Sequence, residues 1–434
     1  MRGMNSATVD LIYLDPPFNS KANYAAPIGS AAAGAAFKDT WTLNDLDVEW
    51  LDLIESQHPV LHRVIMAAMK DSDKSYLVYM AIRLVEMRRL LKPTGSIYLH
   101  CDPTMSHYLK VVMDAVFGRD LFQNEIVWKR NSSHNDSKRF GRVSDTILFY
   151  GKNINKDAVR VPLDPDYVAK FYRYRDAKRG RYTSGDLTAK GLSGGGYYYD
   201  FYGHPGPWRF PEERMQALDK DGRIHLTKTG NVPRLKRFLN ENKGQVPPSI
   251  WSDIPPVQAR AKERTGYPTQ KPLALLHRII KASSNEGDMV LDPFCGCATT
   301  CVAAHNYGRS WVGIDISSKA ADLVVERISE AQGSIYKDII HREDIPPRTD
   351  LGPIPKYNCK ENKDKLYGKQ GGYCAGPGCK AHFEPRHLEV DHIIAKSKGG
   401  TDHIDNLQLL CGHCNSVKGN RGMKYLRERL RLAA

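Results

Sequence analysis

Four consecutive residues near the start of the chain, Asp15-Pro16-Pro17-Phe18, combine groups that could do chemistry. They follow an apolar segment, residues 9–14, that we expect to be a buried strand, and the prolines end it because neither can donate to a strand ladder. The Asp15 carboxylate and the Pro16 carbonyl are both acceptors, so together they could hold both hydrogens of a primary amine, while Phe18 could stack on a planar base. A capping aspartate before a proline turn is the structural alternative.

A second candidate is the segment from Asp292 to Thr300, which has the pattern of a strand, a turn of small residues and a helix start. Small residues let backbone amides approach a ligand closely at a helix N-terminus. Asp315 stands at the tip of the next expected strand, where a carboxylate could bind ribose hydroxyls. The pattern indicates a nucleotide-like cofactor site, with an ordinary α/β turn as the alternative.

Two cysteine pairs near the C-terminus have the spacing of a metal site. Four residues separate Cys374 from Cys379, two separate Cys411 from Cys414, and 31 lie between the pairs. Four thiolates suit a tetrahedral structural zinc ion, which would stabilise a segment too small to bury a large core. The odd total of nine cysteines, the paired spacing and the absence of a visible signal peptide favour a reducing compartment, such as a bacterial or phage-type cytoplasm.

The elements that must position these motifs alternate between helix and strand. Apolar spacing predicts helices near residues 75–91, 107–117, 272–282, 299–305 and 319–331, and strands at 96–100, 125–128, 146–150, 289–291 and 311–314. We expect residues 92–95 to break the first of these helices. The alternation predicts an α/β fold with a mostly parallel, Rossmann-like sheet.

The charge is concentrated in two segments. The chain carries a formal charge of +14; residues 151–265 hold 22 Lys/Arg against 13 Asp/Glu, residues 351–434 hold 15 against 8, and the remainder is slightly acidic. Such a surplus indicates a polyanionic partner, most often nucleic acid, with a well-solvated surface as the alternative. The ordinary composition excludes a wholly disordered chain, and no apolar run is long enough to span a membrane.

Together, the first two motifs resemble those of the amino-group DNA methyltransferases that use S-adenosyl-methionine. In that family Asp-Pro-Pro-Tyr/Phe is the catalytic motif and Asp-Pro-Phe-x-Gly-x-Gly is the cofactor motif. The catalytic motif precedes the cofactor motif in this chain, which is similar to the β arrangement of the family. The segment Gly266-Tyr267-Pro268-Thr269-Gln270-Lys271-Pro272-Leu273 is similar to its third signature, which also borders the cofactor. The resemblance covers roughly residues 8–330.

The resemblance implies roles for individual residues. Asp15, Pro16, Pro17 and Phe18 would hold a base flipped out of duplex DNA, since its amine is otherwise buried in base pairing. The cofactor pocket would be lined by Asp292, Pro293, Phe294, Gly296, Asp315, Thr269, Gln270, Lys271 and Pro272. Aspartate at the first motif position goes mostly with adenine N6 in this family and serine with cytosine N4, so adenine is favoured and cytosine remains the alternative.

The sequence departs from the family pattern at two places. Ala298 stands where the family usually has a second glycine. Relatives usually carry another strand, ending in Gly-Asp, before the catalytic strand, and we hypothesise that Met1 is an internal start or that the gene is truncated.

The C-terminal segment, over roughly residues 370–420, looks like the HNH nuclease family, a ββα-metal fold. By that resemblance His392 is the general base that activates water, and Asn406 braces the loop that orients it. Asp391 and Asn415 would hold one divalent cation, magnesium or similar, against the scissile phosphate. The alternative is a zinc-stapled module that only binds DNA.

These motifs predict five regions. They are a catalytic half at 1–150, a target-recognition insert at 151–265, a cofactor-binding half at 266–340, a linker at 341–358 and an HNH domain with its zinc site at 359–434. We expect aromatic residues such as Tyr197–Tyr199 to form the core of the insert.

We therefore expect a site-specific DNA methyltransferase fused to a metal-dependent HNH endonuclease or nickase, acting on double-stranded DNA in restriction-modification or phage DNA metabolism. A methyltransferase with a DNA-binding zinc module, and an inactive methyltransferase remnant with a live nuclease, are the alternatives. The recognition sequence and the oligomeric state, homodimer included, stay open.

Overall fold

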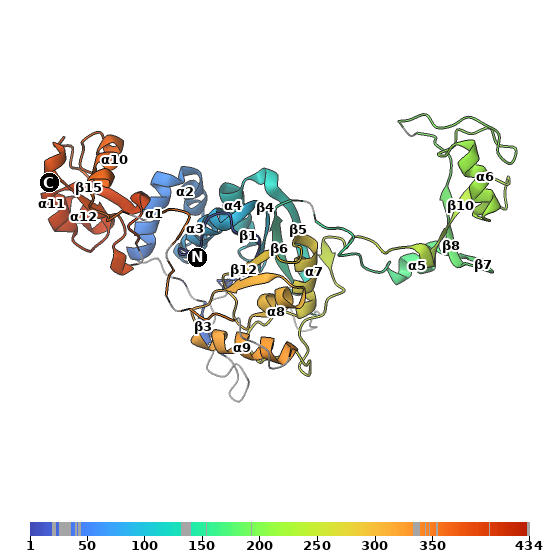
Figure 1. The fold of residues 1–434 in the computed structure, drawn as a ribbon, viewed down its shortest axis with the longest axis horizontal. Coiled ribbons are helices and arrows are strands. Elements are labelled where there is room, and N and C mark those ends of the chain that lie inside the picture. Colours follow the sequence, from blue (N-terminus) through green and yellow to red (C-terminus); the bar gives the residue numbers. More distant parts are fainter. Residues whose placement is uncertain are drawn as a thin grey trace. The chain divides into compact units, whose positions relative to one another are not determined.

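The computed structural model describes residues 1–19, 23–25, 36–39, 41, 45–131, 140–152, 154–191, 193–332, 339–342, 344–346, 348–352, 355–398 and 400–431. The chain divides into two compact units (Figure 1). Unit 1 comprises Met1–Asn155 and Pro248–Ala434, and unit 2 comprises Lys156–Pro247. Each unit has its own sheet.

A seven-stranded sheet with the order β11-β5-β6-β4-β1-β12-β13 is the centre of unit 1. Its strands are β1 Val9–Leu14, β4 Leu91–Cys101, β5 Phe122–Lys129, β6 Ser144–Tyr150, β11 Ile250–Trp251, β12 Met289–Asp292 and β13 Ser310–Gly313. β6 runs antiparallel to β4 and β5, and the other neighbours are parallel. The expected α/β architecture with a mostly parallel sheet is thereby confirmed.

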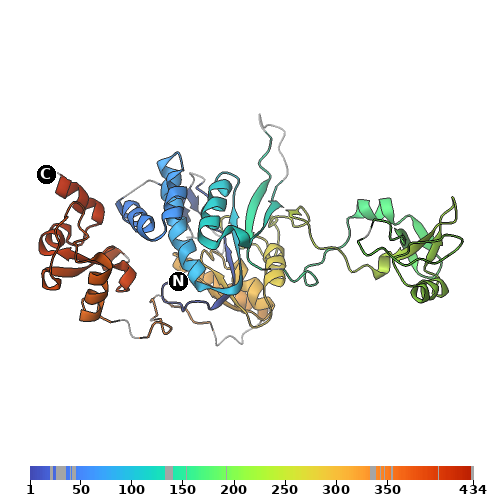
Figure 2. The same cartoon turned by 90° about the horizontal axis from the view of Figure 1, so that it is seen from above.

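Helices cover both faces of this sheet, as Figures 1 and 2 show. They are α1 Asp45–Gln57, α2 Pro59–Met66, α3 Asp71–Leu90 and α4 Ser106–Phe117 on one face, α7 Leu273–Ser283 and α8 Thr299–Asn306 on the other, and α9 Ser318–Gln332 beside α8. Successive side chains of a strand point to opposite faces. Accordingly Ile12 and Leu14 pack with α3, while Leu11 and Tyr13 pack with α7.

Helix α3 ends at Leu90, before residues 92–95, which we expected to break it and which lie within the following strand. β4 begins at Leu91, and its register against β1 shifts so that Val9 pairs with Leu91 and Leu11 with Ser96. The prediction of a strand that starts only at Ser96 was therefore wrong, because a bulge accommodates the extra residues within the strand.

Unit 2 is built on a four-stranded antiparallel sheet with the order β7-β8-β10-β9. Its elements are α5 Pro165–Phe171, β7 Tyr174–Asp176, β8 Gly180–Asp186, α6 Glu212–Lys220, β9 Ile224–Leu226 and β10 Pro233–Phe238. Leu187, Phe201, Trp208 and Met215 form its buried core. Tyr199 packs against that core, whereas Tyr197 and Tyr198 are 49% and 76% exposed, so the expectation of a core position was wrong for these two.

The C-terminal part of unit 1 is a small ββα module. It consists of α10 Lys360–Gln370, β14 Leu388–His392, β15 Leu407–Cys411, α11 Gly412–Lys418 and α12 Met423–Arg431. β14 and β15 pair antiparallel, and the core between them and the helices is formed by apolar side chains and cysteines. The remaining short strands of the chain, β2 Asn23–Ala25 and β3 Ala36–Lys38, pair with each other.

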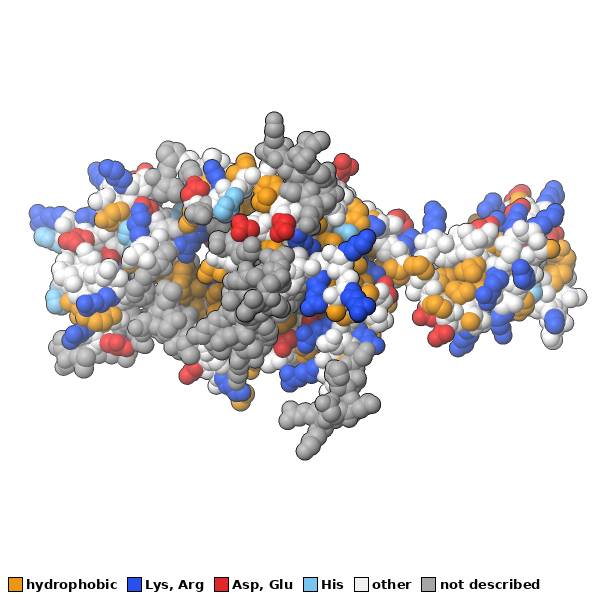
Figure 3. Space-filling model, turned by 90° about the horizontal axis from the view of Figure 1, so that it is seen from below, with side chains coloured by type: hydrophobic (Ala, Val, Ile, Leu, Met, Phe, Trp, Pro, Cys, Tyr) orange, Lys and Arg blue, Asp and Glu red, His pale blue; other side chains and the backbone are white. Residues whose placement is uncertain are grey.

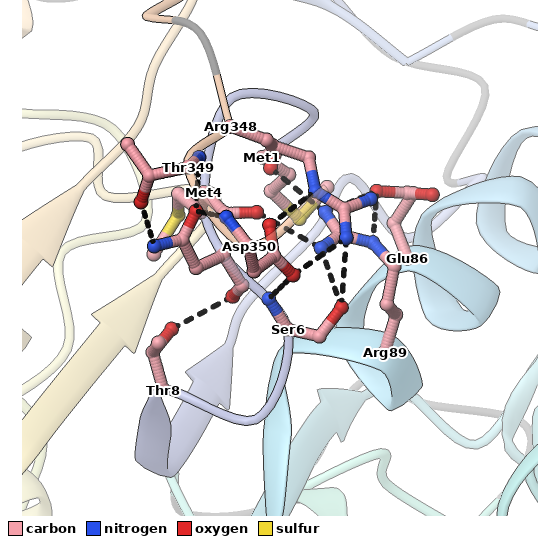
Figure 4. Close-up of polar contacts among 10 residues, drawn as sticks. Met1, Met4, Ser6, Thr8, Glu86, Arg89, Arg348, Thr349 and Asp350 are labelled. Carbon is pink, nitrogen blue, oxygen red and sulfur yellow. Dashed lines mark hydrogen bonds and ion pairs between the residues drawn. The ribbon is translucent and has the colours of Figure 1, made fainter. Parts of the chain in front are cut away.

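Part of the segment predicted to be a linker is anchored to the residues that precede β1 (Figure 4). Ser6 N donates to Asp350 Oδ2 over 2.9 Å, and the Arg348 guanidinium donates to Ser6 Oγ over 3.0 Å. Asn5 Nδ2 donates to Thr349 Oγ1 over 2.7 Å. Residues 348–350 therefore belong to the body of the sheet domain. Among the helices described, none is long and apolar enough to cross a bilayer.

Candidate active sites

A cavity of about 530 Å³ lies at the carboxyl ends of β1, β12 and β13. It is lined by residues of all three methyltransferase-like motifs, namely Asp15–Phe18, Thr269–Lys271, Asp292–Gly296 and Asp315. Neighbouring parallel strands end at the same edge of a sheet, which is where α/β folds bind their ligands. Segments more than 250 residues apart in the sequence thus meet in one pocket.

The two oxygens of Asp15 have different surroundings. Oδ2 accepts a hydrogen bond of 2.5 Å from Lys271 Nζ. Oδ1 is buried and has no partner among the described residues. A buried carboxylate oxygen without a donor costs on the order of 1–3 kcal/mol, so it is a strong acceptor for any amine that enters the pocket.

The backbone and ring of Phe18 are held from two sides. Its N–H donates to Asp39 Oδ2 over 3.2 Å, and the ring stacks on buried His100 with centroids 5.9 Å apart. His100 Nε2 lies 3.1 Å from Asp145 Oδ2. Because that carboxylate can only accept, Nδ1 of the neutral ring is the acceptor, and the Tyr13 hydroxyl donates to it over 2.8 Å.

The contacts around His100 also affect the pKa of Asp145. Burial alone would raise the pKa of its carboxyl, but the hydrogen bond from His100 and the charges of Lys271 and Arg130 bring that pKa below its ordinary value. His100, on which Phe18 stacks, therefore has a buried, ionised carboxylate as its partner. No sequence pattern pointed to His100 or Asp145.

On the other side of the pocket, Asp292 is buried and crowded by other acids. Burial, together with the charges of Asp15 and Asp315, raises the pKa of Asp292 to about 7. Its Oδ1 accepts from Phe294 N over 3.1 Å. A ligand that brings positive charge would favour the ionised form of this carboxylate.

The turn after β12 has the tight backbone that small residues allow. Gly296 N donates to Asp315 Oδ2 over 2.8 Å, and a Cβ on Gly296 would lie 2.9 Å from the Tyr267 ring. Ala298 adopts φ 60° and ψ 30°, the left-handed conformation that glycine enters without strain. The position where the family usually has a second glycine is thus the one where glycine would fit best.

The loop before α7 is braced by its own side chains. Gln270 Nε2 donates to the Glu263 carbonyl over 2.6 Å, and Gln270 Oε1 accepts from Thr265 N over 2.9 Å. Gln270 lines the cavity, but its amide is engaged in holding the loop. Pro272, which we also expected at the cofactor, is not among the residues lining the cavity. Tyr267, which belongs to the third signature, lines the cavity, and so do Tyr79 and Arg83, which the motifs did not indicate.

In the C-terminal module the four cysteines converge. The sulfurs of Cys374, Cys379, Cys411 and Cys414 all lie within 4.8 Å of one another. A tetrahedral zinc ion at about 2.3 Å from each sulfur needs sulfurs about 3.8 Å apart, so this donor set fits the ion. Backbone N–H groups of Gly376 and Cys411 point at Cys374 Sγ over 3.3 and 3.2 Å, an arrangement that stabilises a thiolate.

The nuclease-like residues lie at the other end of the β14–β15 pair, where His392 is opposite Leu407 and Cys411 is opposite Leu388. His392 Nε2 donates to Asp402 Oδ1 over 2.7 Å, which leaves Nδ1 as the ring nitrogen able to take a proton. Asn406 Oδ1 accepts from Ile394 N over 3.0 Å, and its Nδ2 donates to the Thr401 carbonyl over 2.9 Å. The buried Asn406 amide thus ties together the loop that follows His392.

The two residues expected to hold a cation have protein partners. Asp391 Oδ2 lies 3.0 Å from buried Lys418 Nζ and 2.9 Å from Gln408 Nε2. Asn415 Nδ2 donates to Glu389 Oε2 over 2.5 Å. Neither Lys418 nor Asp402 was indicated by the motifs.

Two family models match the chain. The model of DNA methylases matches residues 9–326, and that of HNH endonucleases matches residues 374–421. The first match covers well over half of the chain, so the protein belongs to the N6/N4 DNA methylase family. It carries, in addition, a C-terminal HNH endonuclease domain.

Similar proteins come from restriction-modification systems. The chain is 36% identical to the type II methyltransferase M.EcaI of Enterobacter cloacae over 59% of this chain and 58% of that one. It is 32% identical to the type III restriction-modification enzyme StyLTI Mod subunit of Salmonella typhimurium over 68% and 46%. The DNA adenine methyltransferase YhdJ of Escherichia coli is 25% identical over 76% and 80%. The chain spans about half the length of the first two relatives.

Proposed function

We propose that this protein is a site-specific DNA methyltransferase that methylates the N6 amine of adenine. The observation that carries the proposal is the single pocket that unites the Asp15–Phe18 motif with Asp292 and Asp315. Adenine is supported by Asp15 itself and by the similarity to an adenine methyltransferase. Cytosine N4 methylation is the second candidate, because the family includes both.

The chain's own residues would orient the amine. Asp15 Oδ1 and the Pro16 carbonyl accept its two hydrogens, which turns the nitrogen lone pair toward the cofactor side, and Phe18 stacks on the base. S-adenosyl-methionine, when bound, supplies an electrophilic methyl group on a sulfonium. Asp292 and Asp315 would hold that cofactor, and the acidic surroundings of Asp292 suit its positive charge.

Incorporation of labelled methyl groups into DNA tests this function. Wild-type protein with labelled S-adenosyl-methionine is expected to label duplex DNA, and Asp15→Ala should lower the rate at least about 10³-fold. Asp120→Ala removes an aspartate outside the pocket and serves as the control. No incorporation by the wild type into DNA of several hosts would contradict the proposal.

We also propose that the C-terminal domain nicks or cleaves DNA. Support comes from His392, whose Nδ1 is available as a base, from Asn406 in the brace position and from the fit of four thiolates to a structural zinc ion. Asp391 and Asn415 would hold a divalent cation. Supercoiled plasmid with MgCl₂ should be nicked by the wild type and not by His392→Ala; a module that only binds DNA would leave the plasmid intact in both cases.

Unit 2 is proposed to contact the DNA that the pocket methylates. Residues 156–247 carry 18 Lys/Arg against 11 Asp/Glu, and blue basic side chains are spread over its visible surface in Figure 3. A cavity of about 920 Å³ in this unit is lined by Arg214 and Arg237, whose guanidinium groups have no hydrogen bond or ion pair with any described residue. Unpaired arginines are suited to phosphate contacts.

Salt-dependent DNA binding tests that contact. With Arg214→Gln and Arg237→Gln combined, the slope of log Kd against log salt should shrink by about two, because each phosphate contact contributes about 0.9. Lys190→Gln with Lys228→Gln removes the same charge from exposed positions outside the cavity. An equal change in both double variants would show that the cavity has no special part in binding.

A further inference from the structure

Lys271 lies at the centre of the pocket, although the family signature that contains it suggests a cofactor residue. Its Nζ is 2.5 Å from Asp15 Oδ2 and 3.2 Å from the Thr269 carbonyl, and its side chain is only 8% exposed. The ammonium also lies 5.3 Å from the centroid of the Phe18 ring. Each of these contacts except the Thr269 carbonyl is with the catalytic motif.

The lysine fixes the orientation of the Asp15 carboxylate. Oδ2 is engaged with Lys271, whereas Oδ1 is buried and has no partner among the described residues, so a hydrogen-bond donor gains most at Oδ1. A carboxylate that could rotate freely would offer either oxygen and lose orientational precision. Lys271 thus fixes the acceptor in one geometry before the substrate arrives.

The lysine also opposes a concentration of negative charge. Asp15 shares the pocket with Asp292 and Asp315, and among the described residues Lys271 is the one cation within ion-pair distance of Asp15. Lys271 therefore offsets the repulsion among these carboxylates and keeps Asp15 in place.

The loop is shaped to deliver this contact. Thr269 has φ 62°, a left-handed conformation that is rare for a β-branched residue. The strained turn directs its carbonyl at Lys271 Nζ, while Gln270 ties the turn to residues 263–265. Backbone strain of this kind persists only where surrounding contacts over-determine it, and functional sites are where it concentrates.

We propose that Lys271 is a positioning residue of the methyl-transfer reaction, which holds the Asp15 carboxylate in one orientation through Oδ2 and leaves Oδ1 for the target amine. This inference rests on the proposed methyltransferase function. It assigns the lysine to the substrate side of the pocket in place of the cofactor side.

The test compares Lys271→Met and Lys271→Arg with the wild type in methyl incorporation and in calorimetric binding of S-adenosyl-methionine. Lys271→Met should lower kcat at least about 100-fold, with the cofactor Kd within about threefold of wild type. Lys271→Arg, which keeps the charge, should recover most of kcat. A raised cofactor Kd with unchanged kcat would overturn the proposal.

A readout independent of activity separates this inference from the proposed function. Asp15→Asn, Lys271→Met and the double variant form a cycle of melting temperatures, in which paired residues give clearly non-additive shifts. Additive shifts would refute the pairing even if the wild type methylates DNA. Non-additive shifts in a protein that transfers no methyl group would refute the function and, with it, the role given to the lysine.

Discussion

In both candidate active sites a buried lysine pairs with the aspartate that the motifs single out, yet the two aspartates differ in what they can still bind. Asp15 has one oxygen on Lys271 and one without a partner among the described residues. Asp391 has Lys418 and Gln408 on the same oxygen, and Lys418 lies 3.4 Å from the other. Asp15 therefore keeps one oxygen for an amine, whereas both oxygens of Asp391 already lie beside the Lys418 ammonium.

The difference follows from the chemistry each site would perform. Orienting a neutral amine requires a rigid acceptor in a fixed place, which a preorganised pocket provides. A divalent cation held by Asp391 and Asn415 would take carboxylate and amide oxygens as ligands and compete with the Lys418 ammonium for Asp391. The first site thus depends on its geometry, and the second would depend on an exchange of partners.

Loss of the zinc site should have the largest effect of all the changes. It should impair the C-terminal module and leave the methyltransferase part intact. Binding of structural zinc is worth about 10–16 kcal/mol in small domains, more than a module of this size gains from its own core. Cys374→Ser should abolish plasmid nicking and expose residues 359–434 to proteolysis, while methyl incorporation stays near wild type. Unchanged nicking in this variant would mean that the module is stable without four thiolates.

Lys418→Met should destabilise the module by about 3–5 kcal/mol, because it leaves Asp391 buried without its cation. Hydrogen exchange of peptides from residues 388–418 in the full chain measures the loss. Lys380→Met, at an exposed position of the same module, is the matched control and should change protection by less than about 0.5 kcal/mol. Equal protection in Lys418→Met and Lys380→Met would show that Lys418 does not stabilise the module through Asp391.

The raised pKa of Asp292 predicts that the stability of the methyltransferase part of the protein depends on pH. Between about pH 4 and pH 7 the folded protein keeps a proton that the unfolded chain releases, so stability from this group falls as pH rises through that window. Asp292→Asn should be more stable than wild type at pH 8, on the order of 3 kcal/mol, and similar at pH 4. Melting curves across this range check the sign.

Cofactor binding should follow the opposite trend. Because the cofactor is positively charged, wild-type Kd for S-adenosyl-methionine should fall as Asp292 ionises near pH 7, and Asp292→Asn should show no such step. An identical pH dependence in variant and wild type would exclude Asp292 as the responsible group.

The smallest effect is expected at Ala298. Glycine would relieve about 1 kcal/mol of left-handed strain, but it removes a buried methyl group worth about 0.8 kcal/mol. Ala298→Gly should therefore melt within about 2 °C of the wild type. A larger shift of the melting temperature in either direction would show that relief of strain and loss of the methyl group do not offset each other.

Sequence reasoning found what is encoded locally. Asp15 and Asp292 are recognisable because the strand, the turn and the residue types follow one another along the chain. The four cysteines are recognisable because metal ligands come in closely spaced pairs. The order of helices and strands around them was also predictable, since apolar periodicity reports which face is buried.

What the sequence did not indicate depends on the tertiary fold. Lys271 and Asp15 are 256 positions apart in the sequence, and His100 and Asp145 are 45 apart. No local spacing pattern could therefore predict either pair. Lys418 lies in a helix where a lysine is ordinarily solvated, and only packing against β14 buries it. The anchoring of residues 348–350 depends in the same way on residues 5 and 6.

Long-read sequencing of DNA from a host that expresses the protein tests the central claim most directly. Wild type and His392→Ala should each modify adenine at N6 within one short sequence motif, and Asp15→Ala should leave that motif unmodified. A genome without any modified motif, or the same modification in the presence of Asp15→Ala, would contradict the account.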